Sequence, residues 1–139
     1  MATDTPQQAL DELIEEFGFF DNWMDRYQYI IDLGKQLPPL ADEWKTTEHR
    51  IDGCQSNVWI HHERQAERLH FEAMSDAAIV SGLIAVVMRI YNDRTPQAIL
   101  DMPKDCLDQL GLSQRLSPTR NNGLHAMLGH IYLTAAQQS

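Results

Sequence analysis

The stretch from Ile79 to Ile90 is the part of the sequence that most constrains the fold. Its apolar side chains fall into two neighbouring rows with helical spacing: Ile79, Leu83 and Val87, and Val80, Ile84 and Met88. A helix with both rows presents a wide apolar face, which needs a partner to cover it. The stretch is too short to span a bilayer and is interrupted by Ser81, Gly82 and Arg89. It therefore predicts a central helix packed against a sheet.

Amphipathic helices are predicted before and after this central helix. The first two end at or near Gly18 and Gly34, and Pro38-Pro39 then breaks the chain. Their apolar stripes are Leu10, Leu13, Ile14 and Phe17, followed by Trp23, Tyr27, Ile30 and Ile31. Thr95-Pro96 and Ser117-Pro118 each combine a capping residue with a proline at the first helical position. The second of these pairs opens a C-terminal helix, with the stripe Leu124, Met127, Leu128 and Ile131.

Three short strands are predicted in the middle of the chain: His49 to Ile51, Val58 to His62 and Leu69 to Ala73. The last of them alternates apolar and polar residues, as a strand with one buried face does. The link from Glu63 to Glu67 fits a hairpin loop, and Ser75 or Asp76 is predicted to cap the central helix. We therefore expect one α+β domain, residues 1–139. In it, N-terminal, central and C-terminal helices pack a small three-stranded antiparallel sheet.

Charge restricts the kind of partner that such a chain can meet. The formal net charge is −9, from 20 acidic residues and 11 Lys and Arg. Nucleic acids and anionic membranes require a basic face, so this balance argues against both and favours a basic patch on another protein. The N-terminus has no secretory signal pattern, so we expect a cytoplasmic protein with its two cysteines as free thiols.

Cys54 is the residue whose side chain is best suited to act as a nucleophile. It follows Gly53 directly and precedes the apolar run Val58 to Ile60, which places a thiol on a turn at the mouth of a strand. An unperturbed cysteine is only about 3% ionised at pH 7, so a nucleophilic role needs a cation, a helix N-terminus or backbone N–H groups nearby. The local residues are equally compatible with a small buried cysteine, so they leave both interpretations open.

Other reactive residues point to no site by themselves. His49, His61, His62 and His70 fall in the strand region, but His61 and His62 would point to opposite faces of one strand. No pair of ligands has the spacing that sets tetrahedral metal geometry, so strand-packing or surface histidines are expected. Cys106 has no supporting motif and is interpreted as structural or incidental. A thiol hydrolase using Cys54 lacks a residue to orient its base.

Residues Gly53-Cys-Gln-Ser-Asn-Val-Trp59 resemble the active-cysteine signature of the SufE family, the sulfur-acceptor partners of cysteine desulfurases. Further blocks resemble the family in the same order: Tyr29 to Gly34 with Leu37-Pro38, Ser75 to Val87, and Leu112 to Met127. The resemblance runs from about Trp23 to Ile131. It implies a SufE/NifU-like α+β fold.

The resemblance also implies a function. The cysteine matching Cys54 would take the terminal sulfur from the persulfide of a pyridoxal-phosphate-dependent cysteine desulfurase, SufS-like or CsdA-like. It would hold the sulfur as a persulfide, stimulate the desulfurase, and pass the sulfur to iron–sulfur cluster assembly or another acceptor. Pyridoxal phosphate belongs to the partner, so neither a cofactor nor a metal is expected on this chain. Neither independent enzyme activity nor binding to nucleic acid or membrane is expected.

Three more residues match family positions. Arg120 corresponds to an arginine associated with the cysteine site, where a cation stabilises a thiolate or persulfide. Gln55 stands beside the thiol, and Asp76 matches an aspartate at the start of the central helix, near the partner face. Asn57 stands where many relatives carry glutamine. The alternative, a metal or iron–sulfur scaffold of related fold, needs about three cysteines or equivalent ligands, and the motif offers one.

Overall fold

The computed structural model describes residues 5–51 and 57–139, with the side chain of Ser113 excepted. Its helices and strands are, in chain order, α1 (Pro6–Gly18), α2 (Trp23–Gly34), β1 (Val58–Gln65), β2 (Arg68–Ser75), α3 (Ala78–Tyr91), α4 (Pro96–Asp101) and α5 (Pro118–Gln138). Four short 3₁₀ turns join them: η1 (Asp42–Trp44), η2 (Thr47–His49), η3 (Cys106–Leu110) and η4 (Leu112–Gln114). None of these helices is both long and apolar enough to cross a membrane.

The predicted helix boundaries are largely confirmed, with one error. Thr95 and Ser117 cap α4 and α5, each followed by a proline, and α1 and α2 end at Gly18 and Gly34. The predicted cap of α3 is wrong, because its N-cap is Ala77 and no side chain caps it. Ser75 and Asp76 do not cap α3 because the side chains of both form hydrogen bonds with Asn57 instead.

The sheet has two strands among the described residues, where three were predicted. β1 and β2 pair antiparallel, with Val58 opposite Ser75 at one end and Gln65 opposite Arg68 at the hairpin. The expected strand from His49 to Ile51 is wrong, because His49 ends the turn η2, held by a hydrogen bond of 2.9 Å between Thr46 Oγ1 and His49 Nδ1. Only an isolated bridge between Arg50 and Trp59 remains of the third strand.

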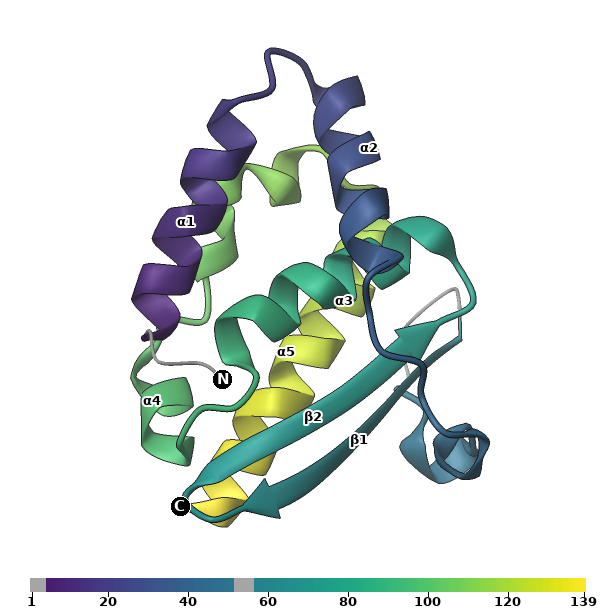
Figure 1. Ribbon diagram of the computed structural model, residues 1–139, viewed down its shortest axis with the longest axis vertical. Coiled ribbons are helices and arrows are strands. Elements are labelled where there is room, and N and C mark those ends of the chain that lie inside the picture. Colours follow the sequence, from purple (N-terminus) through teal and green to yellow (C-terminus); the bar gives the residue numbers. More distant parts are fainter. Residues whose placement is uncertain (1–4, 52–56) are drawn as a thin grey trace.

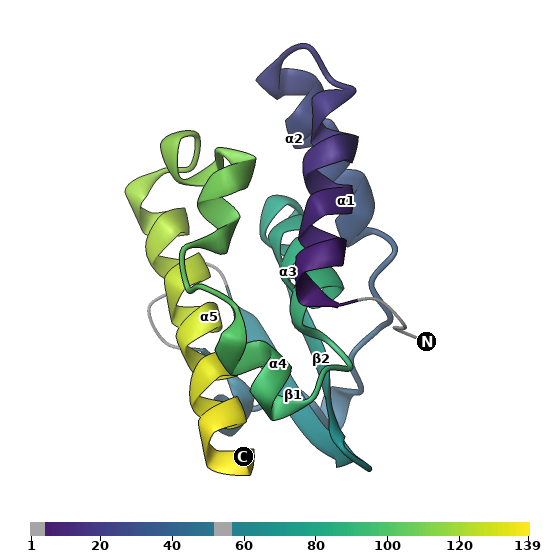
Figure 2. The same cartoon turned by 90° about the vertical axis from the view of Figure 1, so that its left-hand side faces the viewer.

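α3 lies at the centre, as its apolar rows predict. It contacts α1, α2, α5 and β2, while α5 runs along the molecule beside α4 (Figures 1 and 2). The crossing of α2 and α3 is especially close at Gly34 and Gly82. A Cβ atom built on Gly82 would lie 2.2 Å from the carbonyl oxygen of Ile30. The two glycines therefore bring two helix backbones into direct contact.

A buried arginine joins the sheet to the end of α3. Arg94 is only 2% exposed, and its Nε donates to the carbonyl of Ile90 at 2.9 Å. Its own carbonyl accepts the N–H of Leu69 at 2.8 Å, which forms an isolated bridge to β2. Since a buried cation is stable only when its donors are satisfied, this residue fixes the path of the chain between α3 and α4.

Candidate functional site

The cysteine motif is bounded by two anchored ends. Cys54 and Gln55 lie outside the described residues, so the structure shows the residues on either side of them. On the N-terminal side Ile51 is buried, and its N–H donates to the carbonyl of Val58 at 2.8 Å. Together with the bridge between Arg50 and Trp59, this bond ties the incoming chain to the start of β1.

Asn57 anchors the other end. Its backbone N–H donates to Asp76 Oδ1 at 3.2 Å, and its side-chain Nδ2 donates to Asp76 Oδ2 at 2.9 Å. Its carbonyl accepts a hydrogen bond of 2.7 Å from the Ser75 hydroxyl. The same hydroxyl accepts the N–H of Ala77 at 3.2 Å, so the junction of β2 and α3 holds Asn57 on three sides.

Asp76 therefore has a structural partner that the sequence did not reveal. Its carboxylate is exposed and lies just before α3, where a negative charge also interacts favourably with the helix dipole. Both of its oxygens accept hydrogen bonds from Asn57. Hydrogen bonds to a charged acceptor are stronger than neutral ones, so Asp76 couples the start of α3 to the end of the cysteine motif.

Arg120 occupies the first turn of α5, as predicted. Its backbone N–H donates to the capping hydroxyl of Ser117 at 3.2 Å, and its side chain is exposed. The guanidinium forms no ion pair with any residue that the structure describes, including Asp76. A guanidinium that pairs with no described carboxylate is available for an anionic group. Its distance from Cys54 is not defined, because Cys54 lies outside the described residues.

A shallow hollow of about 330 Å³ separates the incoming chain from α5. It is lined by Glu48, His49, Arg50 and Ile51 on one side and by Ala126, Gly129, His130 and Leu133 on the other. The Nε2 atom of His130 is buried with no hydrogen-bond partner among the described residues. Burial, and then the charge of His62, lower the pKa of His130. Sequence reasoning missed His130 because nothing in a helical stripe marks a histidine that faces a strand.

His61 and His62 lie on opposite faces of β1, as predicted. The ring of His61 stacks on Trp44 with centroids 3.7 Å apart, whereas His62 lies 6.2 Å from Phe71 and 6.5 Å from His130. His70, on β2, pairs through Nδ1 with Asp93 at 2.7 Å. Within residues 5–51 and 57–139, no group of three or more His, Cys, Asp or Glu side chains is arranged to hold a metal ion.

Cys106 is a buried thiol at the start of a polar chain. It is 1% exposed and lies 3.2 Å from the Tyr91 hydroxyl, which lies 2.9 Å from the Tyr132 hydroxyl. Tyr132 donates its only proton to the carbonyl of Met102 at 2.8 Å, so Tyr91 must donate to Tyr132, and Cys106 to Tyr91. Burial raises the pKa of the Cys106 thiol. Both observations describe a buried thiol that stays protonated at neutral pH.

Comparison with known proteins supplies the family. The model of the SufE family, described as an Fe-S metabolism associated domain, matches residues 11–135. An uncharacterized SufE-like protein of Rhizobium etli is 41% identical over 128 residues, which cover 88% of this chain and 86% of that protein. The solution structure of a hypothetical protein from Thermus thermophilus has the same fold. It matches with a TM-score of 0.77 at 19% identity, covering 94% of this chain and 95% of that one.

The matched residues begin within α1 and end within α5, so they take in most of the core, both anchored ends of the cysteine motif, Asp76 and Arg120. The chain belongs to the SufE family, whose domain is associated with iron–sulfur metabolism.

Proposed function

We propose that this chain is a sulfur acceptor, which takes persulfide sulfur from a cysteine desulfurase onto Cys54 and passes it on to iron–sulfur cluster assembly. The observation that carries the proposal is the position of Cys54. It stands in the segment Gly53 to Trp59, inside the residues matched by the family model, which is associated with iron–sulfur metabolism. Residues 1–139 act as one domain in this proposal.

The chemistry is an exchange at sulfur. The Cys54 thiolate attacks the terminal sulfur of the partner's persulfide, a new S–S bond forms on Cys54, and the old S–S bond breaks. The partner's cysteine leaves as a thiolate, so no external oxidant or reductant is needed. Pyridoxal phosphate stays with the partner, where it releases sulfur from free cysteine. Removing the partner's persulfide frees its cysteine for another turnover, which explains a stimulating effect on the desulfurase.

Arg120 is proposed to stabilise the thiolate and the persulfide anion. Support comes from its exposed guanidinium, which has no ion pair with a described residue. A nearby cation lowers the pKa of a cysteine and increases its thiolate fraction at neutral pH. Gln55 is proposed to hydrogen-bond the sulfur from the adjacent position in the motif.

Asp76 is proposed to act through Asn57, as a positioning residue on the face that meets the partner. Its two hydrogen bonds support this, since they fix the backbone three residues after Cys54. Loss of these hydrogen bonds changes the positions that the Cys54 thiol can occupy, but it leaves the pKa of the thiol unchanged. A positioning role thus predicts an altered rate of sulfur transfer at an unchanged thiol pKa.

The test is intact mass after sulfur loading. The protein is incubated with a SufS-like or CsdA-like desulfurase, cysteine and pyridoxal phosphate, and its mass is measured without reductant. The expected gain is one sulfur, roughly 32 Da, as for a reversible persulfide. It should persist in Cys106→Ser, which keeps a hydrogen-bond donor to Tyr91, and disappear in Cys54→Ser. Sulfur found on Cys106, or a gain retained in Cys54→Ser, would overturn the proposal.

A second set of measurements separates binding of the desulfurase from sulfur transfer. Cys54→Ser should still bind the desulfurase, measured by calorimetry, while it no longer stimulates alanine release from cysteine. Arg120→Met should bind as well as the wild type and load sulfur more slowly. Loading by one desulfurase type and not by the other identifies the partner. A wild-type chain that neither binds nor stimulates either type would refute the assignment.

A further inference from the structure

The outer face of the β1–β2 hairpin carries a group of histidines and glutamates. In the hairpin His61 is opposite Glu72, and Glu63 is opposite His70. Directly opposite residues of an antiparallel pair share one face, with their Cβ atoms about 4.5–5.5 Å apart. The four residues are therefore neighbours. Their face is turned away from the core, because the residues that alternate with them along β2 are buried.

Each histidine lies close to the glutamate two residues further along its own strand. His61 Nε2 is 3.3 Å from Glu63 Oε1, and His70 Nε2 is 3.9 Å from Glu72 Oε1. Because the strands are antiparallel, both contacts fall between the same two rungs of the ladder, side by side across the hairpin. With bonds of about 2.1 Å, two ligands of a tetrahedral zinc ion lie about 3.4 Å apart. The first pair has this separation, and the second is slightly wider.

A carboxylate holds His70 from its other side. Its Nδ1 atom lies 2.7 Å from Asp93 Oδ1. The Asp93 backbone is fixed in turn, since its N–H donates to the carbonyl of Leu69 at 3.0 Å and its own carbonyl accepts from Arg68 at 2.7 Å. A carboxylate that accepts the Nδ1–H of a histidine fixes the tautomer in which Nε2 can bind a metal, and most metal-bound histidines have such a partner. The hairpin thus has a supporting residue as well as candidate ligands.

The charges on this face suit a divalent cation. Glu63, Glu72 and Asp93 form no ion pair with a lysine or arginine of the described chain. Arg68 is the only Lys or Arg on the outer face of the hairpin, and its guanidinium donates to the Asp93 carbonyl. Three carboxylates therefore face one guanidinium. Imidazole and carboxylate together are ligands that zinc takes, whereas Mg²⁺ and Ca²⁺ prefer oxygen ligands.

Among the described residues these four side chains form two pairs and do not converge on one point. The glutamates are long and partly exposed, with 51% of the Glu63 side chain and 35% of the Glu72 side chain open to solvent. They can turn towards a shared ion by rotation about their own side-chain bonds, with the ladder unchanged. Sequence reasoning missed the group because it compared His61 with its neighbour in the chain, whereas the partners of His61 also come from the other strand.

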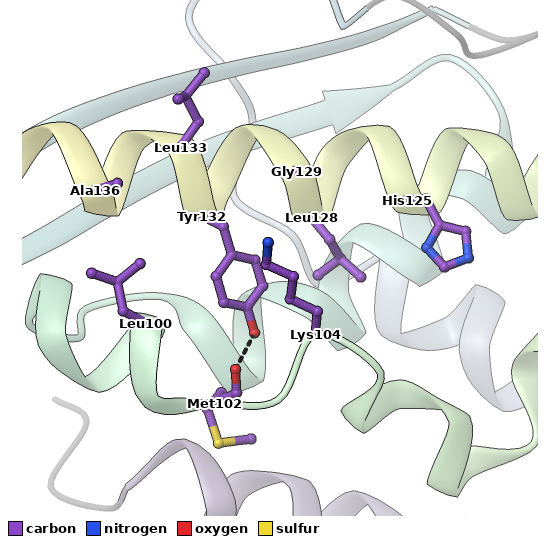
Figure 3. Close-up of a pocket in the computed structure, with 9 residues that line it drawn as sticks. All are labelled: Leu100, Met102, Lys104, His125, Leu128, Gly129, Tyr132, Leu133 and Ala136. Atoms are coloured by element: carbon purple, nitrogen blue, oxygen red, sulfur yellow. Dashed lines mark hydrogen bonds between the residues drawn. The ribbon is translucent and has the colours of Figure 1, made fainter.

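The larger hollow beside α5 offers no comparable set of ligands. Figure 3 shows Leu100, Met102, Leu128 and Tyr132 around a volume of about 460 Å³. His125 is the only His, Cys, Asp or Glu among the described residues that line it, and the Tyr132 hydroxyl donates to the Met102 carbonyl at 2.8 Å. The hairpin is therefore the better place for a metal ion.

We propose that His61, Glu63, His70 and Glu72, the hairpin site, bind a zinc ion, and that Asp93 orients His70. The ion takes the place of the two histidine–glutamate contacts and joins β1 to β2 through two ligands from each strand. Four protein ligands leave no open position for a substrate, so the site is structural. It does not use the cysteine motif, and it goes beyond the sulfur-acceptor proposal without depending on it.

The experiment is a calorimetric titration of Zn²⁺ into the untagged chain with Cys54→Ser, which removes a reactive thiol as a competing ligand. One zinc ion per chain is expected, and amide shifts of the ¹⁵N-labelled protein should centre on β1 and β2. Mg²⁺ should not compete, because it requires octahedral oxygen ligands. No desulfurase takes part, so failure of the sulfur-acceptor proposal would not affect this result.

Substitutions identify the ligands. His61→Phe keeps the ring that stacks on Trp44, and His70→Phe likewise keeps a ring; each should weaken zinc binding by at least about tenfold. Asp93 has a φ of 58°, a conformation that asparagine tolerates. Asp93→Asn should therefore fold normally, weaken binding about tenfold and leave the stoichiometry unchanged, as loss of a carboxylate that orients a ligand does. His62→Phe is the matched control, because it is the same change on the opposite face of β1, and it should leave the affinity unchanged.

Four results would overturn the proposal, once circular dichroism has shown that the variants are folded. Zinc affinity weaker than about 1 mM is the first. Equal weakening by His62→Phe and His61→Phe is the second. Amide shifts confined to residues outside the hairpin are the third. The last is zinc binding that survives the combination of His61→Phe and His70→Phe.

Discussion

Gly82→Ala tests the close crossing of α2 and α3 most directly. The added Cβ would lie 2.2 Å from the Ile30 carbonyl oxygen and 2.5 Å from Ile30 Cγ2, and real Cβ atoms essentially never approach within 3.0 Å. The first distance must therefore grow by at least 0.8 Å. The obstacle is backbone, so no rotamer change relieves it, and the two helices must separate through the core.

The expected free-energy change combines two opposing effects. Overpacking a core costs about 1–3 kcal/mol, and a backbone obstacle places this site at the upper end. Replacing glycine by alanine inside a helix stabilises the helix by about 1 kcal/mol. The free energy of unfolding should fall by roughly 2 kcal/mol. With a urea dependence of about 1–3 kcal/mol per M, the unfolding midpoint should drop by roughly 1 M.

Gly129→Ala provides the matched control, since it is the same change in another long helix. Its Cβ would meet nothing within 4 Å, so only the helix propensity acts and the urea midpoint should rise. Urea unfolding is followed by far-ultraviolet circular dichroism for both variants. A midpoint that stays or rises in Gly82→Ala, or one that moves alike in both, would refute the packing argument.

Three further predictions concern the site and the histidines. Asp76→Ala removes both hydrogen bonds to Asn57 and should speed amide exchange at Asn57 and Val58 several-fold, as loss of about 1 kcal/mol predicts, while Glu72→Ala leaves it unchanged. Iodoacetamide should label Cys106 only in denaturant, because this thiol is 1% exposed and burial raises its pKa. Cys54→Ser limits the readout to this one thiol, and labelling of Cys106 in the native chain would contradict its burial. Burial lowers the pKa of His62 and His130 below 6.5, so the unfolded chain binds protons first. The stability they support is complete above pH 6.5 and should decline as the pH falls below it, with a smaller slope in His130→Leu.

The helices could be predicted because their signals are local. The Ser117-Pro118 pair and the apolar rows of α3 specify a start and a face within a few residues, and the structure confirms both. The prediction of a third strand was wrong because strand pairing depends on residues that are distant in the sequence. Ile51 is apolar and pairs with Val58, but η2 ends two residues before it and leaves no length for a ladder.

The site was predictable in part, for the same reason. Motifs in the sequence single out Cys54 and Arg120 as candidates, which stay predictions, but no local signal shows which group Asp76 binds. Its partner, Asn57, is separated from it by the whole hairpin. The burial of His130 Nε2, which has no hydrogen-bond partner in the part of the chain that the structure describes, likewise depends on how α5 lies against β1, and only the assembled fold defines that.

The hydrogen-bonded chain from Cys106 through Tyr91 to Tyr132 has a consequence for biosynthesis. Its last hydroxyl comes from α5, 41 residues after Tyr91 in the sequence, and Tyr91 is fully buried in the core. A nascent chain that has not yet released α5 from the ribosome leaves the Tyr91 hydroxyl without its acceptor, at the cost of an unsatisfied polar group. The core around Tyr91 is therefore completed only once α5 has left the ribosome, and variants truncated before Tyr132 should be degraded faster than the 139-residue chain.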